Sequence, residues 1–251
     1  MDNVNIKKGV FLLPSLLSCM NIFCGFYAII ASFNHKYYHA AIAILLAIFF
    51  DILDGRVARM TNTTSEFGLQ LDSLADTVSF CIAPGVLSYV WVLTPFGRIG
   101  WMAAFLYVIC GILRLARFNV QSLLVRGKYF IGLPTPAAAG FIASLIIFMR
   151  DVFSFGKIHP IVLVITVYLL AFLMVSKIKY QNFKQLDLRE KKPFSLLVFA
   201  VLAIYITATV PQIMFFLFAC AYILSGPVER FAFSKKSKDA LPLQEAGKTQ
   251  P

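Results

Sequence analysis

Charged side chains are scarce in this chain of 251 residues: only 14% of its residues are Asp, Glu, Lys or Arg. A soluble globular domain carries about 25% charged residues. By contrast, 59% of the residues are hydrophobic and 25 of them are Phe. A soluble fold could not cover that much apolar surface. The composition therefore excludes a soluble domain and predicts an all-α membrane protein with several spans.

Cysteine and histidine are also few, and neither shows a metal-binding pattern. The five cysteines all fall in apolar runs, their number is odd, and none has metal-ligand spacing. We interpret them as buried free thiols. The three histidines, His35, His39 and His159, lie near the predicted outer side, so we assign them no chemistry.

Long apolar runs divide the chain into eight candidate membrane spans. They cover about residues 10–32, 38–60, 67–93, 99–119, 134–149, 158–176, 194–209 and 211–228. The first run is too long for the h-region of a signal peptide, so we expect it to be retained. The last two are short and separated by a tight break. Residues 1–233 thus form one predicted transmembrane domain, and the polar residues 234–251 form a predicted disordered tail.

The basic residues predict the orientation of these spans. With the N-terminus in the cytoplasm, the outer side keeps only Lys36, Arg98, Arg150 and Lys157, and the other 19 of the 23 Lys and Arg are cytoplasmic. This is a strong positive-inside bias, and it places both termini in the cytoplasm. The net charge of +11 then mostly reflects basic residues that orient the spans in the membrane. It favours contact with anionic lipid headgroups over nucleic-acid binding.

Four of the 12 acidic residues fall in two adjacent spans: Asp51, Asp54, Asp72 and Asp76. Their spacings of three and four residues place each pair on one helix face. The polar turn 59–66 joins two antiparallel helices, so the two acidic faces can meet near the cytoplasmic boundary. Four such carboxylates cannot all stay ionised without positive charge among them. One source of that charge would be arginine, from Arg56, Arg59, Arg114 and Arg117.

The other source would be a metal. Oxygen ligands without His or Cys suit a hard cation such as Mg²⁺ or Mn²⁺. Four carboxylates are enough to hold two ions about 4 Å apart, an arrangement that polarises phosphoryl groups. Gly55 and Gly68 lie among the aspartates, where a glycine provides either close helix packing or room for a nucleotide or diphosphate.

The spacing of these residues matches a known motif. Residues 51–59 read Asp51-Ile-Leu-Asp54-Gly55-Arg-Val-Ala58-Arg59, and residues 68–76 read Gly68-Leu-Gln-Leu-Asp72-Ser-Leu-Ala-Asp76. All eight specified positions resemble the signature D-x-x-D-G-x-x-A-R-x₈-G-x-x-x-D-x-x-x-D of the CDP-alcohol phosphotransferase family. The resemblance implies a six-helix core, a homodimer, and transfer of a phosphatidyl or similar group from a CDP-linked donor to an alcohol.

The same resemblance assigns roles to individual residues. Asp51, Asp54 and Asp72 are implied metal ligands, and Asp76 is implied to be both a ligand and the catalytic base. The residues implied to frame the CDP group of the donor are Gly55, Ala58, Arg59 and Gly68.

Further segments are similar to the phosphatidylserine synthases of that family: residues 72–84, 114–119, 132–140, 173–180 and 222–227. The likeness implies CDP-diacylglycerol as donor, L-serine as acceptor and a bacterial inner membrane as location. Arg114 and Arg117 would then hold a phosphate or the serine carboxylate, unless they only snorkel at a span end. Asn119 and Asn21 are polar groups that serve either a headgroup or an interhelical hydrogen bond.

Two other functions stay open at this point. One keeps the fold and the chemistry but uses another alcohol, such as glycerol 3-phosphate or inositol phosphate. The other is a cation transporter, although acidic groups confined to two adjacent spans near one membrane face argue against a complete ion path.

The predicted orientation can be tested directly. A cysteine introduced near Ser65, in the polar turn between the acidic spans, should be protected from a membrane-impermeant thiol reagent in intact cells. It should react once the cells are opened. Labelling of this position from outside intact cells would contradict the cytoplasmic placement of the acidic residues.

Overall fold

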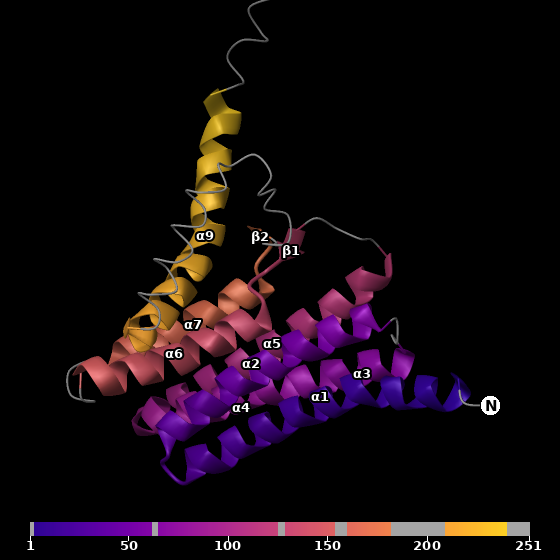
Figure 1. The fold of residues 1–251 in the computed structure, drawn as a ribbon. Coiled ribbons are helices and arrows are strands. Elements are labelled where there is room, and N and C mark those ends of the chain that lie inside the picture. The colour runs from indigo at the N-terminus through magenta and orange to yellow at the C-terminus, as the bar shows by residue number, and fades with distance from the viewer. Residues whose placement is uncertain (1–2, 62–64, 125–128, 154–159, 182–208, 240–251) are drawn as a thin grey trace, which may run out of the picture.

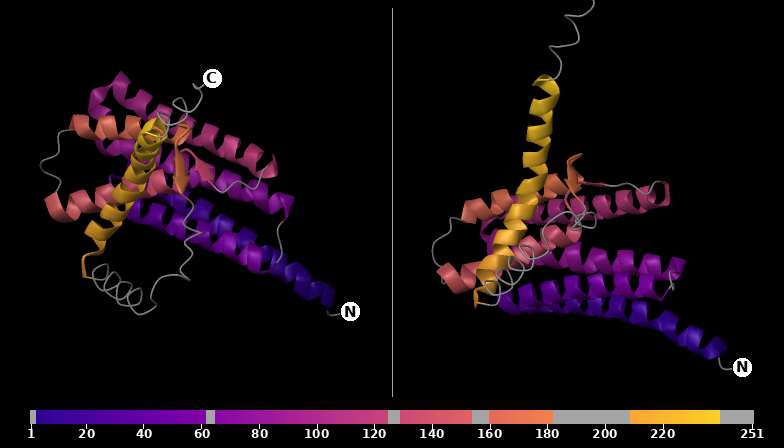
Figure 2. Two further views of the ribbon diagram at one scale, coloured as in Figure 1. Left: turned by 90° about the horizontal axis from the view of Figure 1, so that it is seen from above. Right: turned by 45° about the horizontal axis from the view of Figure 1, so that its top comes forward.

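The computed structural model describes residues 3–61, 65–124, 129–153, 160–181 and 209–239. Its elements are α1 Asn3–Phe33, α2 Tyr37–Met60, α3 Glu66–Asp76, η1 Thr77–Ile82, α4 Ala83–Ser88, η2 Tyr89–Leu93, η3 Thr94–Phe96, α5 Arg98–Leu124, β1 Tyr129–Ile131, α6 Thr135–Phe153, α7 Pro160–Val175, β2 Lys179–Gln181 and α9 Pro211–Asp239. Helices α1 to α7 run roughly side by side, and α9 crosses them steeply and projects beyond the bundle (Figures 1 and 2).

The predicted helical membrane bundle is confirmed. Every predicted span coincides with helix except 194–209, of which all but residue 209 lies outside the described residues. Helix α9 continues to Asp239, into the polar segment 234–251, whose last residues are also outside the described part of the chain. The tail's disorder therefore stays a prediction.

The surface of the bundle is apolar. Large side chains such as Phe23 on α1, Phe105 on α5 and Phe172 on α7 are more than half exposed. Soluble proteins rarely expose contiguous apolar patches of this kind. Within the described part of the chain, three segments are long and apolar enough to cross a bilayer: Leu13–Phe33, Glu66–Phe96 and Arg98–Val120. The chain is an integral membrane protein, and these side chains face lipid.

Small residues form much of the buried interior. Ala40, Ala41, Ala43 and Ala47 on α2 are buried, and α1 packs along this helix. Without bulky side chains between them, membrane helices approach closely and gain van der Waals contact. This close packing holds α1 against the helices that carry the aspartates.

The third predicted span is not one regular α-helix. Ser65 caps α3, with its Oγ accepting a hydrogen bond from the Gly68 N–H (3.0 Å). Directly after Asp76 the helix widens into the π-helical turn η1, and the short α4 then begins at Ala83, with Pro84 in its first turn. Such π-helical turns are rare and occur frequently at functional sites. In this chain the π-helical turn lies next to Asp76, the last of the four aspartates.

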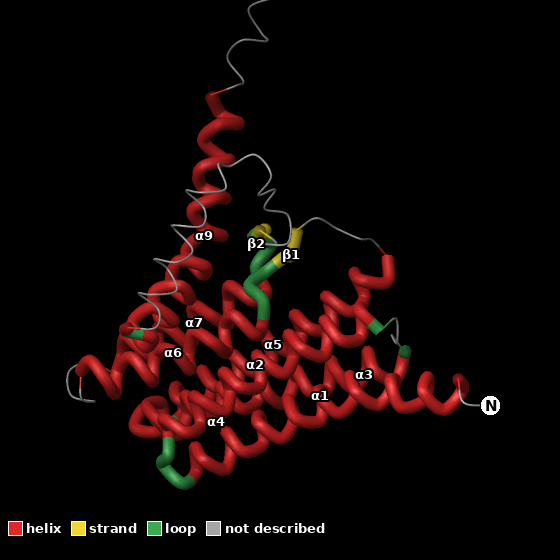
Figure 3. The backbone as a smooth tube through the Cα atoms, viewed as in Figure 1, coloured by secondary structure: helices red, strands yellow, loops and turns green. Residues whose placement is uncertain are grey.

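Two short strands, which the sequence did not predict, tie together the chain after α5 and the chain after α7. Strands β1 and β2 pair antiparallel, with Phe130 opposite Tyr180 (Figure 3). The Gly132 N–H then donates to the Ile178 carbonyl (2.8 Å), in a left-handed backbone conformation (φ 84°) that glycine adopts without strain. These contacts fix the start of α6 and its first residue, Thr135.

Candidate functional site

Three of the four aspartates meet at one point. Asp51 of α2 and Asp72 and Asp76 of α3 each direct one carboxylate oxygen to a spot where the three oxygens lie within 4.8 Å of one another. The predicted meeting of the two acidic helix faces is therefore observed. The carboxyl groups of Asp51 and Asp76 lie within hydrogen-bonding range of each other.

The aspartate cluster fits a divalent cation. Asp72 Oδ1 and Asp76 Oδ1 are buried and have no hydrogen-bond partner among the described residues. A buried carboxylate oxygen without a partner is costly, and arginine does not satisfy these two atoms. Carboxylate oxygens at such close range are the donor set that hard divalent ions prefer. The cluster can thus hold a metal ion.

The fourth aspartate, Asp54, is held by the first helix. It is 4% exposed, and Ser18 Oγ of α1 donates a hydrogen bond to its Oδ2 (2.9 Å). The sequence analysis missed Ser18. The available signal was a hydroxyl in an apolar span, which in membrane proteins often bonds across helices.

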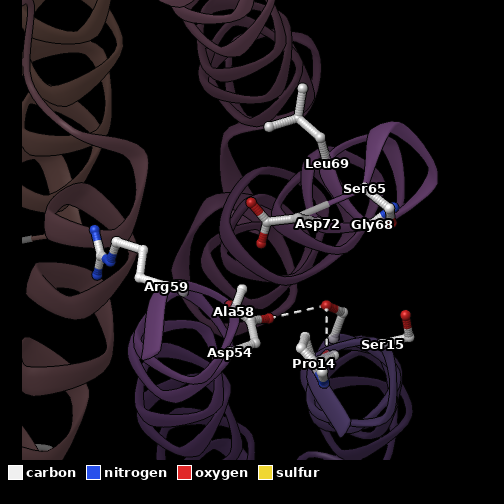
Figure 4. Close-up of a pocket in the computed structure, with 11 residues that line it drawn as sticks. Pro14, Ser15, Asp54, Ala58, Arg59, Ser65, Gly68, Leu69 and Asp72 are labelled. Atoms are coloured by element: carbon white, nitrogen blue, oxygen red, sulfur yellow. Dashed lines mark hydrogen bonds between the residues drawn. The ribbon is translucent and has the colours of Figure 1, made fainter. Parts of the chain in front are cut away.

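A cavity of about 190 Å³ opens beside Asp54 and Asp72, between α1, α2 and α3 (Figure 4). All four residues predicted to frame the CDP group line it: Gly55, Ala58, Arg59 and Gly68. The sequence analysis did not foresee the other contributors, Pro14, Ser15, Ser18, Ser65 and Leu69. The cavity thus brings the two halves of the motif together with the first helix.

The glycines in this cavity leave room rather than pack helices. A Cβ added at Gly55 would meet only the Arg59 side chain, at 3.8 Å. One added at Gly68 would meet Ser65 Oγ, at 3.1 Å, which belongs to the cap of the same helix. Neither glycine lies against a neighbouring helix, so of the two sequence-based alternatives the geometry favours space for a ligand.

The residues predicted to bind serine or phosphate do not line the cavity. Arg114 of α5 is 8% exposed, and its Nη1 donates to Thr135 Oγ1 (3.2 Å). Its Nε has no partner among the described residues, and its charge interacts with Asp76. Arg114 therefore flanks the aspartate cluster from a second side.

No described contact joins Asn119 or Arg117, the other two predicted residues, directly to the aspartates. Asn119 Nδ2 donates to Ser73 Oγ (2.9 Å), which links α5 to α3 between the two aspartates of that helix. This bond matches the interhelical alternative. Arg117 is partly exposed, one turn after Arg114.

Comparison with known proteins gives consistent matches. The family model described as CDP-alcohol phosphatidyltransferase matches residues 11–176. The CDP-diacylglycerol–serine O-phosphatidyltransferase of Helicobacter pylori is 39% identical over 192 residues, which are 76% of this chain and 80% of that protein. The Bacillus subtilis protein of the same name is 38% identical over 69% of this chain and 92% of its own. The archaetidylserine synthase of Methanothermobacter thermautotrophicus is 40% identical over 70% of this chain and 73% of its own length.

Metal binding by the aspartate cluster predicts a change in thermal stability. Mn²⁺ or Mg²⁺ at 100 times its Kd should raise the stability of the purified protein by about 2.7 kcal/mol. Asp72→Asn should abolish this increase, and without metal it should be at least as stable as wild type because one repelling charge is gone. The measurement is Tm with and without metal.

Asp151→Asn is the matched control, because Asp151 is an exposed carboxylate near the far end of α6. This variant should keep the full metal-induced rise in Tm. An equal rise in Asp72→Asn and wild type would show that the cluster does not bind the metal.

Proposed function

Because the chain belongs to the CDP-alcohol phosphatidyltransferase family, we propose that it transfers a phosphatidyl group from CDP-diacylglycerol to L-serine. The products are phosphatidylserine and CMP. The observation that carries this proposal is the cavity beside Asp54 and Asp72, since every motif residue expected around a CDP group lines it. Serine as acceptor is supported by the names of the relatives from Helicobacter and Bacillus.

The donor lipid enters the cavity from the bilayer. Leu69 lines the cavity and is also 51% exposed, and Leu16 on the neighbouring α1 faces outward as well. The rim of the cavity is therefore continuous with the lipid-facing surface. Gly55 and Gly68 give the nucleotide diphosphate access to the helix backbone, and the acyl chains of CDP-diacylglycerol stay in lipid.

The four aspartates would hold divalent cations, either Mg²⁺ or Mn²⁺ and two ions in all. Such ions would supply positive charge that offsets the negative charge of the diphosphate and of the leaving CMP. The convergence of Asp51, Asp72 and Asp76 supports this part of the proposal. Ser18 fixes the orientation of the Asp54 carboxylate beside them.

Asp76 is the proposed catalytic base. Its buried Oδ1 has no partner in the described part of the chain, so it is available to accept the proton of the serine hydroxyl. The serine oxygen forms a bond to the phosphorus that carries the diacylglycerol. The bond between that phosphorus and the bridging oxygen breaks, and CMP leaves with the electron pair. Arg114, whose charge acts on Asp76, attracts the serine carboxylate.

The remaining proposals concern the setting of the enzyme. The positive-inside bias supports a cytoplasmic site and cytoplasmic termini, and the bacterial relatives support the inner (cell) membrane of a bacterium as the location. The homodimer implied by the family resemblance is retained as part of the proposal.

The function is tested by CMP release from CDP-diacylglycerol by the purified protein. Release should require both a divalent metal and L-serine. Glycerol 3-phosphate and inositol phosphate, tested at the same concentration, should give only background. If either of these alcohols gave faster CMP release than serine, that alcohol would be the acceptor instead. Cation flux in proteoliposomes without CMP release would favour a transporter.

The role of Asp76 is tested by Asp76→Asn, which keeps the size and one oxygen but removes the proton acceptor. Turnover should fall by about 10²-fold or more, whereas metal-dependent binding of CDP-diacylglycerol should largely persist. Parallel loss of donor binding and turnover would make Asp76 mainly a metal ligand. Near-normal turnover with a lowered Tm would make it a structural residue.

A further inference from the structure

Unpaired buried polar atoms gather at the site. Among the described residues, the buried side-chain nitrogens and oxygens without a hydrogen-bond partner belong to Asn21, Asp72, Asp76 and Arg114. The last three are accounted for by the proposed chemistry. Asn21 is not. It is 0% exposed, and both its Nδ2 and its Oδ1 lack a partner.

The position of Asn21 on α1 follows from its neighbours. Ser18, one turn earlier, bonds to Asp54 of α2. Helices α1 and α2 are antiparallel, being joined by a short turn, so a step of three residues along α1 matches a step of three back along α2. This step takes Ser18 to Asn21 and Asp54 to Asp51. Asn21 therefore lies one turn deeper in the membrane than the CDP cavity, at the level of Asp51 and its neighbour Asp76.

A second set of contacts holds Asn21 against the helix of Asp76. The Asn21 carbonyl accepts a hydrogen bond from Ser79 Oγ (2.8 Å), and Ser79 lies three residues after Asp76. One turn further along α1, a Cβ added at Gly25 would collide with the Ser79 hydroxyl and lie 2.8 Å from its Cα. Helix α1 and the π-helical turn η1 are thus in backbone contact, so the place of Asn21 is fixed.

An unpaired amide is expensive in such a place. Leaving a buried donor or acceptor unsatisfied costs about 1–3 kcal/mol, and a membrane span offers no water to replace the missing partner. An interhelical bond by the Asn21 side chain, which the sequence left open, is absent from the described residues. Polar groups of this kind inside a membrane protein mark substrate or ion sites.

We infer that Asn21 binds the acceptor L-serine and holds its hydroxyl toward Asp76. An amide offers both a donor and an acceptor, which matches a zwitterion that carries a carboxylate and an ammonium group. The diphosphate of the donor has only acceptors, and Asn21 is not among the residues that line the CDP cavity. Arg114 contributes charge from the side of α5. This inference rests on the proposed function and deepens it.

The test is Asn21→Leu, which has a similar volume and no polar atom. The KM for L-serine should rise by about tenfold or more, as expected for losing hydrogen bonds to charged groups. The KM for CDP-diacylglycerol should stay within about twofold, in keeping with the separate donor cavity. Tm should be unchanged or higher, because an unsatisfied polar group is removed. The metal-induced rise in Tm should persist.

Ser32→Ala is the matched control. Ser32 is also buried on α1, but its hydroxyl is paired with the Ala28 carbonyl (2.6 Å) at the far end of the helix. Both KM values should match wild type. Asn21→Ala is a second variant that leaves more space, and it provides the same readouts should the leucine not fold.

Several results would overturn the inference. A wild-type KM for serine in both Asn21 variants removes Asn21 from the acceptor site. A lowered Tm with both KM values unchanged makes it structural, a rise in the donor KM alone makes it a donor contact, and loss of the metal-induced rise in Tm makes it a metal ligand. If wild-type protein releases no CMP in response to serine, the proposed function itself fails, which is a separate result.

Discussion

Mutual repulsion among carboxylates inside an apolar bundle is the constraint on which the rest of this structure depends. Asp51, Asp72 and Asp76 direct oxygens to within 4.8 Å of one another, in surroundings where charge is poorly screened. Packing contacts and hydrogen bonds offset this repulsion and keep the carboxylates in place. Helix α1 covers the cluster, Ser18 holds Asp54, and close contact at Gly25 presses α1 against the turn after Asp76. Because the carboxylates repel one another, the site favours a ligand of opposite charge.

The parts of the site that follow from local helix geometry could be predicted from the sequence. Spacings of three and four residues place Asp51 with Asp54 and Asp72 with Asp76, and the polar turn between the spans makes the pairs meet. The cavity-lining roles of Gly55 and Gly68 followed from the motif. Seven predicted spans fall on helices for the same reason, because a run of about 20 apolar residues specifies a membrane helix without reference to its neighbours.

What the sequence could not predict depends on contacts between distant segments. The bond from Ser18 to Asp54 joins residues 36 positions apart. A hydroxyl in an apolar span indicates a bond to another helix, but the sequence around Ser18 does not identify Asp54 as the partner. The strands β1 and β2 have three residues each, too few for an alternating pattern to stand out. The π-helical turn after Asp76 contains Ser79, whose hydroxyl donates to the Asn21 carbonyl of α1, a contact between segments 58 residues apart. Arg114, Arg117 and Asn119 share one stretch of sequence, yet only Arg114 is buried beside the aspartates.

The position of Leu69, at once in the cavity wall and on the lipid-facing surface, changes what substrate concentration means for this protein. One substrate diffuses in two dimensions and never has to leave the bilayer, while the other arrives from water in three. Under the proposed function, occupancy of this cavity follows the mole fraction of CDP-diacylglycerol among the membrane lipids, not its amount per volume. Adding inert lipid would slow the reaction by dilution in the plane, whereas adding water would not. The lipid composition of the membrane thereby sets the effective concentration of the donor, and the cell can adjust it.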